Sequence, residues 1–259
     1  MVGQFRELAA HPDADGARLL LDGVHLVREA QRAHLSFDIV VVAASALDAR
    51  EEEGDIALEL ERGGATVLAA DQRTIQAISP VRTPSGIAAI ARRTPASAAT
   101  VCGAAHALVV AAVDVQDPGN MGSLLRAAEA GGATGVLACG ASATPFSWKA
   151  LRGAMGSSLR LPIAAGMTIH EAVRCMKDAK LRMVAAVARG GDDPDAIDWT
   201  GRTGLLLGGE GAGLSDEVAA ACDARVTIGM AAPVESLNVA VAGAILIYAA
   251  RRQRARRPT

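Results

Sequence analysis

The second half of the sequence alternates between short apolar runs and segments with helical spacing. From residue 106 onward, runs such as ALVVAAV and GLLLG are separated by segments such as NMGSLLRAAEAGG and IHEAVRCMKDAK. Runs that are apolar at every position are typical of parallel strands buried on both faces of a sheet. We therefore predict an α/β fold with a parallel sheet over residues 106–259.

A parallel sheet of this kind binds its ligands beyond the carboxyl ends of its strands. The loops that follow the predicted strands read DVQDPGN, CGASAT, LGGEGAG and GMAAPVES. We expect the polar residues of these loops to lie at one edge of the sheet.

Residues 1–95 also alternate between helix and strand patterns and predict a smaller α/β domain of three layers. This part of the chain carries no catalytic motif, so its charged faces indicate either a recognition module or an ordinary solvated surface. Residues 96–105, ASAATVCGAA, are small and predict a linker.

The composition, with 51% hydrophobic and 21% charged residues, is that of a globular protein. We find no apolar run long enough for a membrane span and no basic, then apolar, signal segment, so we expect a cytoplasmic protein without a membrane partner. The four cysteines form no CxxC pair and are expected to be reduced, and the five histidines lack metal-ligand spacing. No metal site is predicted.

The net charge of −2 argues against a protein that coats nucleic acid by bulk electrostatics. The C-terminal segment RRQRARRPT nevertheless carries five arginines and no acid. Such a tail is either a solubilising end or an arm that binds phosphates.

The glycine-rich loop at 207–213 does not have dinucleotide-binding spacing. A G-x-G-x-x-G motif starting at Gly209 would need a glycine where the chain has Leu214, and no Lys-Ser/Thr pair follows to make a P-loop. A nicotinamide oxidoreductase is therefore disfavoured. What remains is a tight loop with one acid, Glu210, which is either a simple turn or a site whose backbone suits an adenine or ribose edge.

Two further segments place polar residues next to predicted helices. In the segment 114–126, Asn120 is a plausible N-cap, and Arg126 lies almost two turns later on a largely apolar helix. An arginine in that setting usually pairs with a carboxylate or a phosphate, so Glu129, Glu210 or a ligand is its expected partner.

In the segment 233–245, Ser236 is predicted to cap a helix that is apolar on every face and hence buried all round. Asn238 would then lie in the first turn of that helix. A polar side chain in such a place needs a partner, either within the core or at a site.

Three ordered segments together carry a resemblance to a known family. VQDPGNMGSLLRAAEAGGATGV contains Asn120 and Arg126, LLLGGEGAGLSDEV contains Glu210, and IGMAAPVESLNVAVAGAI contains Ser236 and Asn238. With RGAMGSSLRLPI, LLLDGVHLVREA and TPSGIAAIARR in support, the chain resembles the SpoU/TrmH family of RNA ribose 2′-O-methyltransferases, of the SPOUT class.

The resemblance implies a C-terminal SPOUT domain with a deep trefoil knot, preceded by an L30e-like domain that binds RNA. It implies S-adenosyl-L-methionine as the cofactor and a homodimer with its active site at or near the subunit interface. The cofactor would be held by residues of the second and third motifs: Leu207, Gly208, Gly209, Glu210, Gly211, Ile228, Gly229, Met230, Ser236, Leu237 and Asn238. Gly229, Ala232 and Ala240 depart from the family pattern, the first two of them in the cofactor loop.

The implied reaction moves a methyl group to a ribose 2′-hydroxyl and needs no metal. The family assigns proton removal to the arginine that matches Arg126, but a guanidinium with a pKa above about 12 is a poor base. Stabilisation of the developing alkoxide and a clamp on a phosphate is the alternative role. Asn120, Glu210, Ser236 and Asn238 would orient the reactants. Ribosomal RNA is the expected substrate; a tRNA substrate and a non-catalytic RNA-binding protein are the alternatives.

Overall fold

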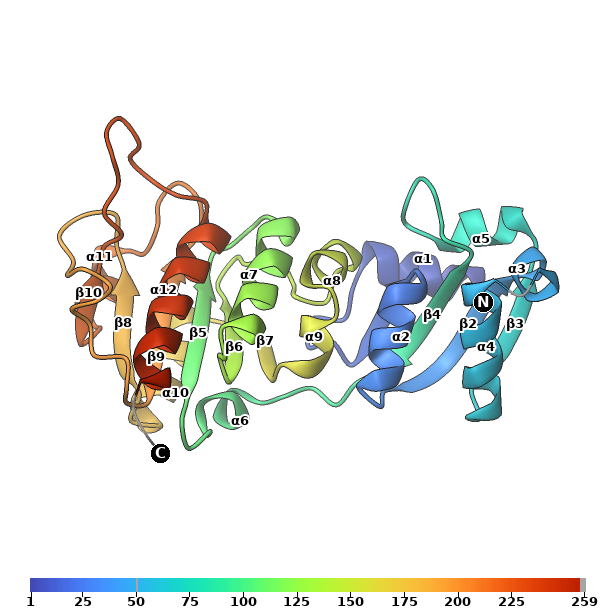
Figure 1. Cartoon of the computed structure of the whole chain (residues 1–259), viewed down its shortest axis with the longest axis horizontal. Helices are drawn as coiled ribbons and strands as arrows, with labels where there is room; N and C mark the ends of the chain where they lie inside the picture. The colour runs from blue at the N-terminus through green and yellow to red at the C-terminus, as the bar shows by residue number, and fades with distance from the viewer. Residues whose placement is uncertain (50, 257–259) are drawn as a thin grey trace. The chain divides into compact units, whose positions relative to one another are not determined.

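The computed structural model describes residues 1–49 and 51–256 and divides into two compact units (Figure 1). Unit 1 comprises Met1–Pro95 and Phe146–Arg160, and unit 2 comprises Ala96–Pro145 and Leu161–Thr259. Arg50 and the last three residues, which include Arg257 of the arginine-rich tail, lie outside the described part.

Unit 1 contains a four-stranded mixed sheet with its helices. Its strands are β1 (Arg18–Asp22), β2 (Ser36–Ala43), β3 (Val67–Ala70) and β4 (Ile87–Arg92), in the order β1-β4-β2-β3. Its helices are α1 (Val2–Ala10), α2 (Val24–Arg32), α3 (Ala44–Asp48), α4 (Glu52–Arg62), α5 (Gln72–Ile78), α8 (Trp148–Ala154) and α9 (Ser157–Arg160). Strand β4 is antiparallel to both of its neighbours, and only β2 and β3 run parallel. The central strand β4 is buried over residues 87–91, and β2 is buried over residues 40–43.

Unit 2 contains a six-stranded sheet in the order β10-β8-β9-β5-β6-β7. The strands are β5 (Leu108–Val113), β6 (Gly135–Cys139), β7 (Ile163–Met167), β8 (Arg182–Ala186), β9 (Thr203–Gly208) and β10 (Ala224–Val226). Every neighbouring pair is parallel, which confirms the parallel α/β sheet predicted from the apolar runs.

Helices cover both faces of this sheet because its strands are apolar on both faces. The helices of unit 2 are α6 (Ala98–Cys102), α7 (Pro118–Ala130), α10 (Ile169–Asp178), α11 (Asp216–Ala220) and α12 (Val239–Ala255). Helices α6 and α10 pack with Leu206 into one buried cluster. The next residue, Leu207, contacts the opposite layer, where Gly243 of α12 fits closely between Leu124 of α7 and Leu207. A Cβ at position 243 would collide with the Leu124 side chain.

Two predicted boundaries, that of the linker and that of the domain over residues 106–259, differ from the structure. Part of the segment expected to be a linker forms α6, whose Val101 and Cys102 are fully buried in the core of unit 2. The segment FSWKALRGAMGSSL forms two helices, α8 and α9, because Met155 and Gly156 between them both have positive φ angles. This segment groups with unit 1, where the Phe146 ring lies against Gly16.

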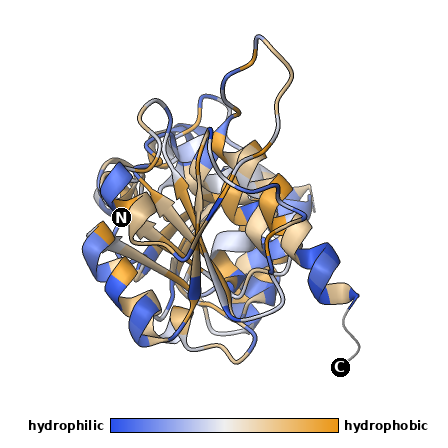
Figure 2. Ribbon diagram, turned by 90° about the vertical axis from the view of Figure 1, so that its left-hand side faces the viewer, coloured by the Kyte–Doolittle hydropathy of each residue, from blue (hydrophilic) through white to orange (hydrophobic). Residues whose placement is uncertain are grey.

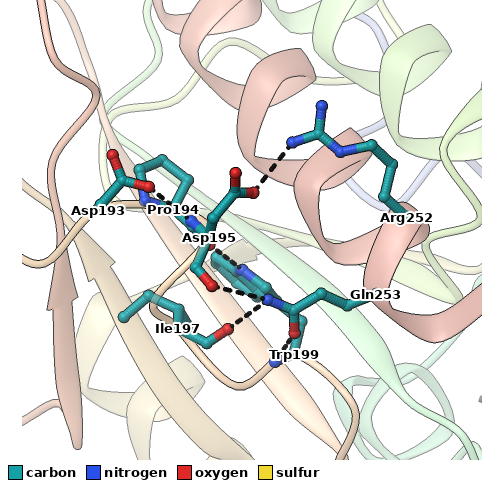
Figure 3. Close-up of polar contacts among 7 residues, drawn as sticks. All are labelled: Asp193, Pro194, Asp195, Ile197, Trp199, Arg252 and Gln253. Carbon is teal, nitrogen blue, oxygen red and sulfur yellow. Dashed lines mark hydrogen bonds and ion pairs between the residues drawn. The ribbon is translucent and has the colours of Figure 1, made fainter. Parts of the chain in front are cut away.

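The last turns of α12 are hydrophilic (Figure 2) and are bound to the loop between β8 and β9 (Figure 3). Gln253 donates to the carbonyls of Asp195 and Ile197 and accepts from the Trp199 amide. The next residue, Arg254, donates to backbone carbonyls of four residues: Trp199, Gly201, His106 and Ala107. These residues of the arginine-rich segment therefore contribute to the fold.

All four cysteines are free thiols. Burial raises the pKa of Cys102 and of Cys139 to about 12, which makes these thiols unreactive. In the described part of the chain, no cluster of three or more histidine, cysteine or acidic residues is arranged to hold a metal ion. Nor does any described helix combine the length and the apolar character that a membrane span requires.

Candidate active site

Three loops of unit 2 meet at the carboxyl edge of the parallel sheet. They follow β5, β9 and β10. Glu210 lies in the second of these loops, Asn238 ends the third, and Asn120 lies in the first turn of α7, directly after the first. In Figure 1 the loop between β10 and α12, in red-orange, extends beyond the sheet at this edge. Parallel strands place these loops together although up to 118 residues separate their polar side chains in the sequence.

Asn120 belongs to the first turn of α7, but it is not the N-cap that the sequence suggested. Asp117 is the N-cap, and its carboxylate accepts the Asn120 backbone amide at 2.8 Å. Pro118 occupies the first helical position, where its missing N–H is no loss. With the cap supplied by Asp117, the Asn120 side chain is available for other contacts.

The start of α12 also differs from the prediction. Asn238, not Ser236, is the N-cap, and its Oδ1 accepts from the amides of Ala240 at 2.9 Å and Val241 at 3.3 Å. Asn is at least as good an N-cap as Ser, and the sequence offered both within three residues. Because Oδ1 faces the helix, Nδ2 of Asn238 points away from it and can donate elsewhere.

Asn120 connects the other two side chains. The Nδ2 of Asn238 donates to Oδ1 of Asn120 at 2.9 Å, and Nδ2 of Asn120 donates to Oε1 of Glu210. The N-cap contact fixes the amide orientation of Asn238, which in turn fixes that of Asn120 and leaves a donor for the carboxylate. We call Asn120, Glu210 and Asn238 the amide–carboxylate cluster.

Glycines position Glu210 by allowing close backbone contacts. A Cβ at Gly209 would collide with the backbone carbonyl of Asp114, and one at Gly208 would collide with the backbone of Gly213. Gly211 has a φ of +99°, a conformation that side chains rarely adopt. The 208–213 loop is therefore folded back on itself and against the end of β5, which holds Glu210 beside Asn120.

A cavity of about 570 Å³ opens beside this cluster. All but one of the predicted cofactor-binding residues line it, and the exception is Gly229. The sequence reasoning missed the segment 186–189 at the end of β8 and the polar residues Asp216 and Arg225, which also line the cavity. Their presence follows from the strand order, in which β8 lies between β9 and β10.

Arg126 and Ser236 do not join the amide–carboxylate cluster. The exposed Arg126 side chain forms no hydrogen bond or ion pair with any described residue, so neither Glu129 nor Glu210 is its partner. Ser236 is exposed and lines the cavity. The structure thus brings together three of the five predicted catalytic residues and leaves an unpaired cation on the same helix as Asn120.

Curated relatives match part of this chain. The chain is 38% identical over 114 residues to an uncharacterized tRNA/rRNA methyltransferase of Mycolicibacterium smegmatis. The aligned residues make up 44% of this chain and 35% of that protein. The chain thus matches about a third of the length of such curated relatives.

Solved structures resemble nearly the whole chain. An AdoMet-bound rRNA methyltransferase from Sinorhizobium meliloti superposes with a TM-score of 0.84 at 28% identity, covering 97% of this chain and 94% of that one. An RNA 2′-O ribose methyltransferase superposes with a TM-score of 0.77 at 26% identity, covering 97% and 96%. The model of the SpoU rRNA Methylase family matches residues 107–248, more than half of the sequence. The chain belongs to the SpoU rRNA Methylase family.

Proposed function

We propose that the protein transfers a methyl group from S-adenosyl-L-methionine to a ribose 2′-hydroxyl of structured RNA, with ribosomal RNA as the substrate. The observation that carries this proposal is the amide–carboxylate cluster, assembled from three loops beside a cavity of ligand size. The family membership and the bound AdoMet of a similar structure support the same activity.

The residues of the cavity fit this cofactor. Its volume of about 570 Å³ lies within the range of small-molecule sites. The 208–213 loop supplies backbone groups for the polar edges of an adenosine, and Leu207, Leu237 and Ile228 supply apolar surface for its rings. When bound, the sulfonium centre of the cofactor provides an already activated methyl group.

The amide–carboxylate cluster would position the reacting groups. Asn238 anchors Asn120, and Asn120 holds the Glu210 carboxylate at the edge of the cavity. This fixed geometry is what an in-line transfer requires, since catalysis then depends on placing the 2′-hydroxyl correctly.

Arg126 would act on the RNA. Its guanidinium has no protein partner among the described residues, so it is free to bind a phosphate and to stabilise the alkoxide that forms on the ribose. Arg126→Ala is therefore expected to reduce methyl transfer about 100- to 1000-fold while S-adenosyl-L-methionine still binds. Unchanged turnover would remove Arg126 from the mechanism.

Unit 1 would bind the RNA substrate, as its resemblance to the L30e-like domain implies. A tRNA substrate is the alternative, because the curated relatives are named tRNA/rRNA methyltransferases. We further propose that the chain between β9 and α12 forms the knot of the SPOUT class and that the protein is a homodimer. An apolar stripe of Val241, Ile245 and Tyr248 on α12 is exposed in the single chain and supports the dimer.

The decisive experiment incubates the protein with S-adenosyl-L-methionine carrying a labelled methyl group and with separated ribosomal and transfer RNAs. We expect label in ribosomal RNA, at a position resistant to alkaline cleavage because the 2′-oxygen is blocked. Label only in tRNA would change the substrate. Binding of RNA without any label would indicate a non-catalytic RNA-binding protein.

A further inference from the structure

An ion pair joins two walls of the cavity. Arg189, in the segment that follows β8, lines the cavity, and its Nη2 lies 3.1 Å from Oε1 of Glu235. Glu235 precedes Ser236, Leu237 and Asn238, which line the cavity from the loop before α12. The guanidinium of Arg189 is thus already placed to hold a carboxylate at this opening.

This ion pair is weak because both of its side chains are exposed to solvent. The side chains of Arg189 and Glu235 are 81% and 80% exposed. Water can therefore solvate both charged groups when the ion pair is broken. Exposed pairs of this kind contribute between about 0 and 1 kcal/mol to stability. A second carboxylate that enters the cavity can therefore replace Glu235 at little cost.

Besides Arg189, three charged residues are described in the cavity lining: two acids and one arginine. Glu210 and Asp216 are acidic and would repel a ligand carboxylate. The other cation, Arg225, has no carboxylate partner among the described residues. Of the two arginines in the described cavity lining, Arg189 is the one whose guanidinium already contacts a carboxylate, that of Glu235.

We propose that Arg189 binds the α-carboxylate of the methionine part of the cofactor and that Glu235 occupies this place until the cofactor enters. The exchange rests on the proposed function above. It makes the carboxylate a determinant of cofactor recognition. It also releases the loop that carries Ser236 from the end of β8 when the cofactor binds.

The test measures calorimetric binding of S-adenosyl-L-methionine and of decarboxylated S-adenosylmethionine, which keeps the sulfonium but lacks the carboxylate. Arg189→Ala should weaken binding of the first about tenfold and leave the second within about twofold. Arg189→Gln should give the same pattern. Glu235→Gln should tighten binding of the first ligand about two- to fivefold, because the competitor is gone, and leave the second unchanged.

The matched control is the exposed pair of Arg252 and Asp195, which has the same separation of 3.1 Å in the same unit but lies outside the cavity lining. Arg252→Ala should change neither affinity. Equal losses for both ligands in Arg189→Ala, or weaker binding in Glu235→Gln, would overturn the exchange. Failure of the unmodified protein to bind S-adenosyl-L-methionine would instead overturn the proposed function.

Discussion

At the scale of single residues, Asn120 has the most demanding position in the candidate site. Its Oδ1 accepts from Asn238 and its Nδ2 donates to Glu210, so both ends of the amide are used. The residue types of this cluster could be predicted from the sequence. Their contacts could not, because two capping residues, Asp117 and Asn238, decide which side chains are free.

We expect Asn120→Ala to reduce methyl transfer about 100-fold, because Glu210 and Asn238 lose their common partner. Cofactor affinity should change less than about threefold, since Asn120 is not part of the cavity lining. Single-turnover rates and calorimetric binding measure the two quantities separately. Ser123→Ala, on an exposed position of the same helix, is the control. A loss of cofactor affinity as large as the loss of rate would contradict a positioning role.

At the scale of secondary-structure elements, α12 shows what apolar periodicity can and cannot predict. The helix was expected to be buried on every face, but Val241 is 49% and Tyr248 45% exposed in the single chain. The sequence identifies the helix because it is long and apolar. It does not identify which stripe faces the sheet, since every stripe is apolar.

The hydrogen bonds of Arg254, near the C-terminal end of α12, lead to a prediction about the stability of the fold. Arg254 donates to four backbone carbonyls, and a lysine could not reach them with one ammonium group. Arg254→Ala should lower the free energy of unfolding by about 2–3 kcal/mol, with Arg254→Lys recovering only part of it. Urea denaturation measures this loss. The exposed Arg256, which ends the same helix, provides the control Arg256→Ala. Equal effects at both positions would show that helix charge, not the carbonyl contacts, matters.

Elements α2 and α9 predict a pH dependence. Glu29 of α2 is 9% exposed and pairs with Arg32 and with Arg160 of α9. Burial acts to raise the pKa of Glu29, but the two arginines outweigh it and lower the pKa below its ordinary value of 4.5. The carboxylate therefore stabilises the fold above that value, and the stabilisation is lost as the pH falls through the lowered pKa.

Glu29→Gln should therefore cost about 1–2 kcal/mol of unfolding free energy at pH 7, and the deficit should shrink below about pH 4.5. Denaturation of both proteins across this pH range measures it. A deficit that stays constant down to pH 3 would mean that the shape of the side chain, not its charge, is what matters. Glu53→Gln, on the first turn of α4, controls for the general effect of removing an acid.

At the scale of the whole molecule, strand order supplied what motifs alone could not. The three sequence motifs identified the loops after β5, β9 and β10. The segment after β8 also lines the cavity, because β8 lies between β9 and β10 in the sheet. Strand order depends on contacts between residues far apart in the chain, so a local pattern does not reveal it. Arg189, which lines the cavity directly after β8, was missed for this reason.

The exposed apolar side chains of α12 lead to a prediction about the oligomeric state of the protein. Val241, Ile245 and Tyr248 lie on one face of α12 at helical spacing, and all three are at least 41% exposed. An apolar stripe of this kind is stabilised when a second copy covers it, and α12 begins at the candidate site. If the protein is the proposed homodimer, Ile245→Glu should convert it to a monomer in sedimentation measurements and reduce methyl transfer at the same time. Leu58→Glu, at a 38% exposed leucine of α4, should leave the mass unchanged. A dimer that survives Ile245→Glu would place the interface on another surface.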